Sequence, residues 1–250
     1  MDLHTAAENG HLEVARLFLD RGAHVDVETL TGATPMHYAC KGGHTDVVRL
    51  LLARGANVNA GNSYEEMRGG NPLHIACYKG YLEIAKLLLD GGANVNSCDE
   101  MEEIRPLHEA CSQGHLDVAQ LLLDRGANAG ATSDDDFSPL HCCGSPEIAR
   151  LLLNHGADLE TKTTYGFTPL HFACNEGRLT TVELLLDLGA NVDSVDKKSA
   201  APLTVACDSG HIDIAKLLLD QGPRFEEAED SIWTPLHAAC EKGELEFVRF

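Results

Sequence analysis

The residues best suited to chemistry are the histidines and cysteines, and six cysteines recur at one place. Each lies three residues after a recurring histidine, or after Thr204 where threonine replaces it: Cys40, Cys77, Cys111, Cys174, Cys207 and Cys240. On a short helix this spacing puts a histidine and a cysteine on one face, as in half of a metal site. Packing explains the recurrence better, because Ala7 fills the same place in the first copy and a free cysteine behaves as a small apolar side chain. With no Cys-x-x-Cys pair in the chain, we expect no metal and no other cofactor.

The thiols are expected to be reduced. Nine is an odd number of cysteines, and Met1–Gly10 lacks the cationic start and apolar run of a secretory signal. Successive copies of the recurring cysteine lie one repeat apart, which is too far for a disulfide. We therefore expect an intracellular, cytoplasmic protein, with the nucleus as the alternative. Cys142 and Cys143, in a shortened copy of the repeat, are expected to be the most accessible thiols.

Catalysis is not indicated. The chain contains neither a Gly-x-Ser-x-Gly nucleophile motif nor a Walker phosphate-binding motif. Its carboxylates are numerous, but none stands where burial would be expected to tune it for acid–base work. We therefore expect no catalytic residues and do not expect an enzyme.

Composition excludes two further classes of partner. The 250 residues include 19 Lys plus Arg and 39 Asp plus Glu, a formal charge of −20. A protein that binds nucleic acid needs a basic surface to displace counterions, and an anionic membrane would repel this chain. The longest unbroken apolar stretches last about one helical turn, so membrane insertion is not expected either.

The elements that position these residues are copies of one unit. The string Thr34-Pro35-Met36-His37-Tyr38-Ala39-Cys40 returns along the chain, and its histidine marks each copy. Successive copies are 33, 37, 34, 33, 30, 33 and 33 residues apart, measured between His4, His37, His74, His108, His141, His171, Thr204 and His237. Such a period indicates a repeat architecture.

Each unit contains the signals for two short helices. Thr34 is a good N-cap, and Pro35 suits the first helical position, where its missing N–H costs nothing. The first helix ends at Gly42-Gly43, and a second, with an apolar face over 47–52, ends at Gly55. One such pair cannot bury its apolar face alone, so neighbouring pairs must stack.

The period and the Thr-Pro-Leu-His string resemble the ankyrin repeat over essentially the whole chain. The resemblance implies an all-α solenoid of stacked helix-turn-helix units joined by β-hairpin fingers, with a concave groove lined by fingers and first helices. It also implies that the recurring histidines hydrogen-bond within and between units. We expect a monomer with a single array over 1–250, divided into units at about 1–27, 28–60, 61–97, 98–131, 132–161, 162–194, 195–227 and 228–250.

The array has four irregularities. The stretch 61–70 is four residues longer than a standard finger, and the finger over 98–105 has one extra residue. The fifth unit loses three residues and has no room for a full first helix, which predicts an altered twist near 143–146. The stretch 221–225 lacks the usual Gly-Ala-x-Val. No polar capping repeat closes either end, which favours an excerpt from a longer protein.

The resemblance makes the fingers and the ends of the first helices the candidate binding surface. Acidic side chains and large apolar side chains both occur there, which is the composition of an acidic rim with aromatic anchors. The alternative is a solvated acidic surface whose aromatic residues cover the neighbouring finger. The candidate protein-binding residues are Glu100, Met101, Glu102, Glu103, Ile104, Ser112, Gln113, Asp134, Asp135, Phe137, Tyr165, Phe167, Asn175, Glu176, Lys197, Lys198 and Trp233.

Three functions fit these expectations. The first is a protein-interaction module or adaptor that binds a basic or amphipathic protein segment in the groove. The second is the substrate-recognition or scaffold part of a larger enzyme or channel that lies outside these residues. The third is a mechanical spacer with no defined partner. The fold alone does not separate them.

Overall fold

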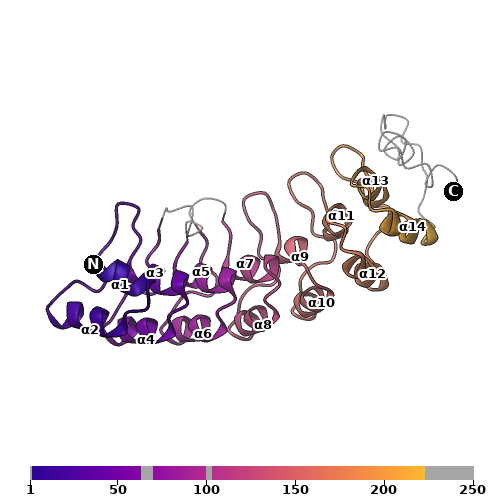
Figure 1. Cartoon of the computed structure of the whole chain (residues 1–250). Coiled ribbons are helices and arrows are strands. Elements are labelled where there is room, and N and C mark those ends of the chain that lie inside the picture. Colours follow the sequence, from indigo (N-terminus) through magenta and orange to yellow (C-terminus); the bar gives the residue numbers. More distant parts are fainter. Residues whose placement is uncertain (1, 63–69, 100–102, 223–250) are drawn as a thin grey trace. The chain divides into compact units, whose positions relative to one another are not determined.

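The structure, a computed structural model, describes residues 2–62, 70–99 and 103–222. These residues form fourteen helices that alternate between two roles (Figure 1). The first helices of the units are α1 (Leu3–Glu8), α3 (Pro35–Gly42), α5 (Pro72–Lys79), α7 (Pro106–Ser112), α9 (Pro139–Cys142), α11 (Pro169–Asn175) and α13 (Pro202–Asp208). The second helices are α2 (Leu12–Asp20), α4 (Thr45–Ala53), α6 (Leu82–Asp90), α8 (Leu116–Asp124), α10 (Pro146–Asn154), α12 (Leu179–Asp187) and α14 (Ile212–Asp220).

The start of α3 shows how the recurring string fixes a first helix. Proline occupies the first helical position, where no N–H is needed. The backbone N–H of Thr34 donates to Nδ1 of His37 at 3.0 Å, and the Thr34 hydroxyl lies 3.0 Å from the same nitrogen. Because Nδ1 accepts, the imidazole proton is on Nε2, which is thereby available to another repeat. The threonine and histidine of the string therefore act together as a cap.

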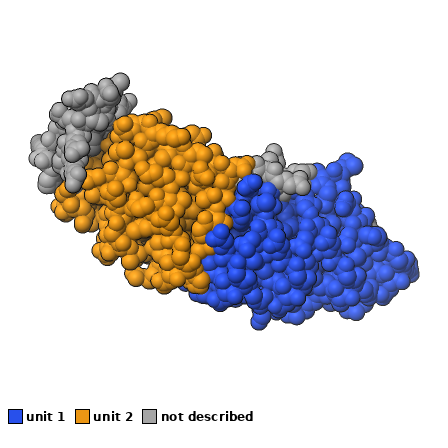
Figure 2. Space-filling view, turned by 180° about the vertical axis from the view of Figure 1, so that it is seen from behind, with its two compact units in different colours: residues 1–128 blue, residues 129–250 orange. Residues whose placement is uncertain are grey.

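The helices form two compact units, Met1–Asn128 and Ala129–Phe250 (Figure 2). In the first, α1, α3, α5 and α7 pack in chain order, as do α2, α4, α6 and α8. In the second, α9, α11 and α13 form one row and α10, α12 and α14 the other. In the core of the second unit both kinds of helix contribute leucine and alanine side chains, as at Leu203 and Ala206 on α13 and at Ala215 and Leu218 on α14. Stacking thus buries the apolar faces that single helix pairs would expose.

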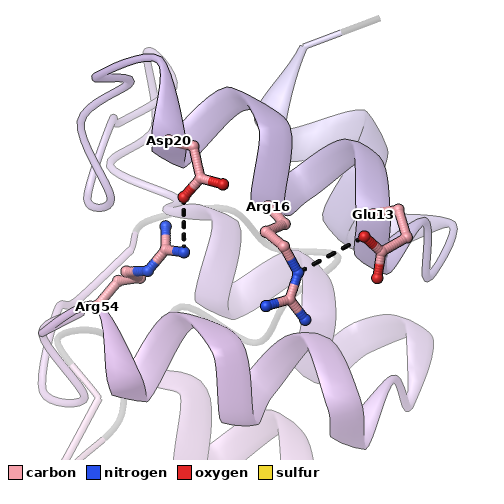
Figure 3. A network of polar contacts seen from close by, with 4 residues as sticks. All are labelled: Glu13, Arg16, Asp20 and Arg54. Atoms are coloured by element: carbon pink, nitrogen blue, oxygen red, sulfur yellow. Dashed lines mark hydrogen bonds and ion pairs between the residues drawn. The ribbon is translucent and has the colours of Figure 1, made fainter.

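Ion pairs join neighbouring second helices on the exposed side of the first unit. Arg54 Nη2 lies 2.8 Å from Asp20 Oδ1, and Arg125 Nη1 lies 2.9 Å from Asp90 Oδ1. Figure 3 shows the first of these pairs beside Glu13 and Arg16, whose charged groups lie 3.6 Å apart within α2. Such exposed pairs contribute about 0.2–1 kcal/mol each, so the apolar core dominates the stacking energy.

The fingers are turns and not the β-hairpins that the resemblance implied. No strand is assigned within residues 2–62, 70–99 and 103–222. Each described finger is closed by a backbone bond across its base, such as Ser133 N to Phe137 O and Thr163 N to Phe167 O, both 3.0 Å. Only a few residues separate the bonded pair, so there is no length for a ladder. The turns pass through a left-handed residue at Gly32, Glu103, Asp136, Gly166 and Ser199.

The expected shortening of the fifth unit is confirmed. Its first helix, α9, has four residues, and the chain leaves the helical path at Cys143, whose backbone is extended. The other described first helices have six to eight residues. The longer stretch at 61–70 and the unit at 228–250 fall mostly or wholly outside the described residues.

Candidate functional site

The recurring histidines are structural. Nε2 of His74, His141 and His171 each lies 3.1 Å from a carbonyl of the following finger, at Ile104, Phe167 and Ala200 respectively. Burial lowers the pKa of the His141 imidazole from its ordinary 6.5 to about 4, so these rings are neutral at pH 7. The hydrogen bonds within and between units that the resemblance implied are therefore present. Each of these three rings thus holds the finger of the following unit.

A second series of histidines joins the repeats at the opposite end of the first helix. These residues follow a glycine and begin the second helix. Nε2 of His44 lies 2.8 Å from the Glu8 carbonyl. Nε2 of His115 lies 3.1 Å from the Tyr78 carbonyl, and Nε2 of His211 lies 3.0 Å from the Asn175 carbonyl. In the sixth unit Arg178 has this place, and its Nη1 donates to the carbonyls of Cys142 and Cys143.

The cysteines in the described ranges are free. Burial raises the pKa of the Cys143 thiol to about 12 and also raises that of Cys77, so both are poor nucleophiles. The expectation that Cys142 and Cys143 are the most accessible is wrong. Cys143 is buried, with its thiol 3.1 Å from the Leu140 carbonyl, and Cys98 is the exposed one. Within the described residues, no group of three or more His, Cys, Asp or Glu side chains could hold a metal ion.

A pocket of about 510 Å³ opens between α11 and α13 in the second unit. Its apolar part is formed by two phenylalanines, an alanine and a valine, and its polar part by side chains at the finger and at the helix ends. The residues that line it are Phe167, His171, Phe172, Asn175, Asp196, Lys198, Ala200, Thr204, Val205 and Asp208. Three of the residues expected from sequence, Phe167, Asn175 and Lys198, lie in this pocket.

An aromatic cluster supports one wall of the pocket. The ring centroids of Phe137 and Phe172 lie 4.8 Å apart, and those of Phe167 and Phe172 lie 5.8 Å apart, both edge to face. Phe137 also stacks on His141 at 5.2 Å. Edge-to-face pairs of this kind stabilise their arrangement beyond the burial of area. Phe137 and Phe167 therefore both pack against Phe172 of α11, and Phe167 also faces the pocket.

The other expected residues are distributed over both units. In the first unit, Glu103 and Gln113 are exposed while Ile104 and Ser112 are half-buried. In the second, Tyr165 is 61% exposed, and the remaining exposed residues are Asp134, Asp135, Glu176 and Lys197. Glu100, Met101, Glu102 and Trp233 lie outside the described residues. The concave groove that the resemblance implied would include residues of both compact units, and it remains a prediction.

Sequence reasoning missed Phe172, Val205 and Asp208, all of which line the pocket. Phe172 and Val205 follow the recurring histidine or its threonine replacement, and Glu109 is at the same place in α7. The residue type at this position differs between repeats, and this variation could have indicated a functional position. A position that served only packing would keep one type of side chain. Asp208 lies at the end of α13, and the candidate residues named from the sequence do not include it.

The fold is that of a stacked repeat protein, and comparison identifies the class. The family model "Ankyrin repeats (3 copies)" matches residues 3–99, 58–133, 107–196 and 170–250, so the chain belongs to the ankyrin-repeat family. Among solved structures, the human ASB11 ankyrin repeat domain is similar to it, with 28% identity and a TM-score of 0.77. The match covers 87% of this chain and 97% of that domain. In a separate comparison, no curated protein matched the chain.

Membership sets the general class of function. Ankyrin repeats are protein–protein interaction modules, and the fold is typically a non-catalytic binding scaffold. In the part of the chain that the structure describes, every helix is too short or too polar to span a bilayer.

Proposed function

We propose that this chain is an interaction module of an adaptor that acts as a monomer and binds a segment of a partner protein in the pocket of the second unit. The observation that carries the proposal is the pocket itself, where Phe167, Phe172 and Val205 present apolar surface beside the polar groups of Asn175 and Asp208. Pockets with an apolar floor and a few convergent polar groups are the usual places where a ligand is held.

The pocket is formed by side chains that are already held in place. Phe167 and Phe172 contact each other, and His171 is fixed by its bond to the Ala200 carbonyl. An ordered site binds more tightly than a disordered one because less conformational entropy is lost. An apolar side chain of the partner entering this pocket would supply most of the affinity, and the polar groups would set its orientation.

The test is a selection of random peptides displayed on phage against the intact chain. Val205→Glu places a charge on the pocket floor, and the occurrence of Glu109 at the same place in α7 shows that a first helix accepts it. Selected peptides should bind this variant at least about tenfold more weakly. The matched control is Glu183→Lys, an exposed site on the second helix α12, which should bind them normally.

Circular dichroism of both variants confirms that the helices are retained. Failure to enrich any peptide, or equal loss of binding in the control variant, would contradict the proposed site.

A further inference from the structure

Three neighbouring finger tips of the second unit differ in charge. The tip of the fifth unit carries Asp134 and Asp135, and the tip of the sixth unit carries Tyr165. The tip of the seventh unit carries Lys197 and Lys198. All five residues are exposed. Within the described residues, neither lysine ammonium nor the Asp134 carboxylate has an ion-pair partner. We call these five residues the tip row. It runs from two negative charges, with the exposed carboxylate of Asp136 next to them in the chain, across an exposed aromatic ring, to two positive charges.

Main-chain bonds fix the order of the tip row. Thr164 N donates to Asp135 O at 2.9 Å, and Lys197 N donates to Tyr165 O at 2.9 Å. The Thr164 hydroxyl adds a bond to Asp135 Oδ1 at 3.3 Å. The backbones approach closely, since a Cβ placed on Gly166 would lie 3.0 Å from Lys197 N. The charges of the tip row therefore have a set sequence in space.

The other charged groups near the pocket limit where a partner charge can lie. Asp196 is buried, and its Oδ1 accepts from Lys198 N and Ala200 N, both at 2.8 Å. Asp208, at the end of α13, is exposed at the opposite end of the pocket from the finger. A negative group of the partner is thus favoured beside the lysines of the tip row and disfavoured beside Asp208.

We propose that the partner segment carries charges of both signs, with a basic side chain over Asp134 and Asp135, an acidic side chain over Lys197 and Lys198, and an apolar side chain between them that enters the pocket. This inference rests on the proposed function and makes the expectation of a basic or amphipathic segment more specific. Packed helices lie about 8–10 Å apart, so two repeats span about 16–20 Å. An extended chain covers that span in about five or six residues.

The experiment uses the peptides that the intact chain selects from the random display library. We expect the enriched sequences to share one basic and one acidic residue about five or six positions apart, with a large apolar residue between them. The selection is repeated on Asp134→Lys/Asp135→Lys and on Lys197→Glu/Lys198→Glu. Each double variant should weaken the original peptides about tenfold and should enrich sequences in which the matching charge is reversed.

The control pair is Glu183→Lys and Arg150→Glu, exposed charges on the second helices α12 and α10, which lie away from the finger tips in Figure 1. Neither should change the selected sequences. Enriched peptides that lack the paired charges, or that keep their charges in the tip-row variants, would overturn this inference while leaving the pocket as the binding site. A selection that enriches nothing would overturn the proposed function itself.

Discussion

The guanidinium group of Arg178 donates from Nη1 to the carbonyl of Cys143 at 2.8 Å and to that of Cys142 at 3.3 Å. In other repeats this place between units belongs to a histidine, as at His44 and His211, or to a tyrosine, as at Tyr81. Because α9 ends at Cys142, the carbonyls to be bonded differ from those of a full first helix. The arginine side chain is longer than that of histidine and reaches these carbonyls. It therefore connects the fifth and sixth units although the helix α9 is short.

Replacing Arg178 should therefore destabilise the second unit. Arg178→Ala leaves two part-buried carbonyls without their charged donor, and we expect a loss of about 1–3 kcal/mol in the free energy of unfolding. Arg178→His should not rescue it, although histidine serves at the equivalent place in other repeats, because the ring is too short. Urea titration followed by circular dichroism measures both, with Arg150→Ala as an exposed control on α10. Equal stability of Arg178→Ala and the control would refute this role.

Amide exchange should be faster at the end of the shortened helix α9 than in first helices of full length. A four-residue helix has few internal hydrogen bonds, and stacked repeats depend on contacts with their neighbours. We expect residues 142–145 to exchange sooner than α5 of the third unit and α11 of the sixth unit. Hydrogen exchange read by mass spectrometry gives the rates. Uniform protection across these segments would show that the Arg178 bonds fully compensate for the missing turn.

Stability should fall as the pH is lowered from about 6.5 toward 4. Burial lowers the pKa of the His37 and His141 imidazoles from 6.5 to about 4, so each is neutral in the folded chain and gains a proton on unfolding below pH 6.5. The unfolded state then binds more protons, and each histidine contributes a loss of about 1.4 kcal/mol per pH unit over this interval.

The measurement is the urea midpoint at pH 7, 6, 5 and 4. His141→Gln should flatten the pH dependence, whereas His155→Gln should not, since the His155 side chain is exposed and bonds only to the Leu151 carbonyl of its own helix. A midpoint that stays constant from pH 7 to pH 5 would contradict the buried neutral histidines.

Alkylation of the native protein should modify Cys98 before the buried thiols. Cys98 is exposed, whereas Cys143 is buried and its pKa is raised to about 12 by that burial. Because the thiolate is the reactive form, the burial of Cys143 and its raised pKa both slow its reaction. Maleimide labelling mapped by peptide mass spectrometry reads each site separately. Labelling of Cys143 or Cys77 at the rate of Cys98 would refute the packing role given to these thiols.

The periodic features could be predicted from the sequence, and the features that depend on an irregular neighbour could not. The interval between histidines fixed the helix pairs, and the three-residue deletion indicated the short α9. The burial of Cys143 was missed because it follows from the extended backbone after α9 and not from the local pattern. Phe172 was missed because its place in the pocket arises from contacts with Phe137 and Phe167 on two separate fingers. The pairing of Arg178 with Cys143 needs the same three-dimensional information.

The bonds that join the finger tips of the second unit link main chain to main chain, from Thr164 N to Asp135 O and from Lys197 N to Tyr165 O. The side chains at the tips therefore contribute little to holding neighbouring fingers together. A tip residue such as Tyr165 can be exchanged for another without breaking the link between neighbouring fingers. The main-chain scaffold and the side chains at its surface are therefore separable, so we expect that substitutions at one finger tip change the surface while the stacked helices beneath it stay the same.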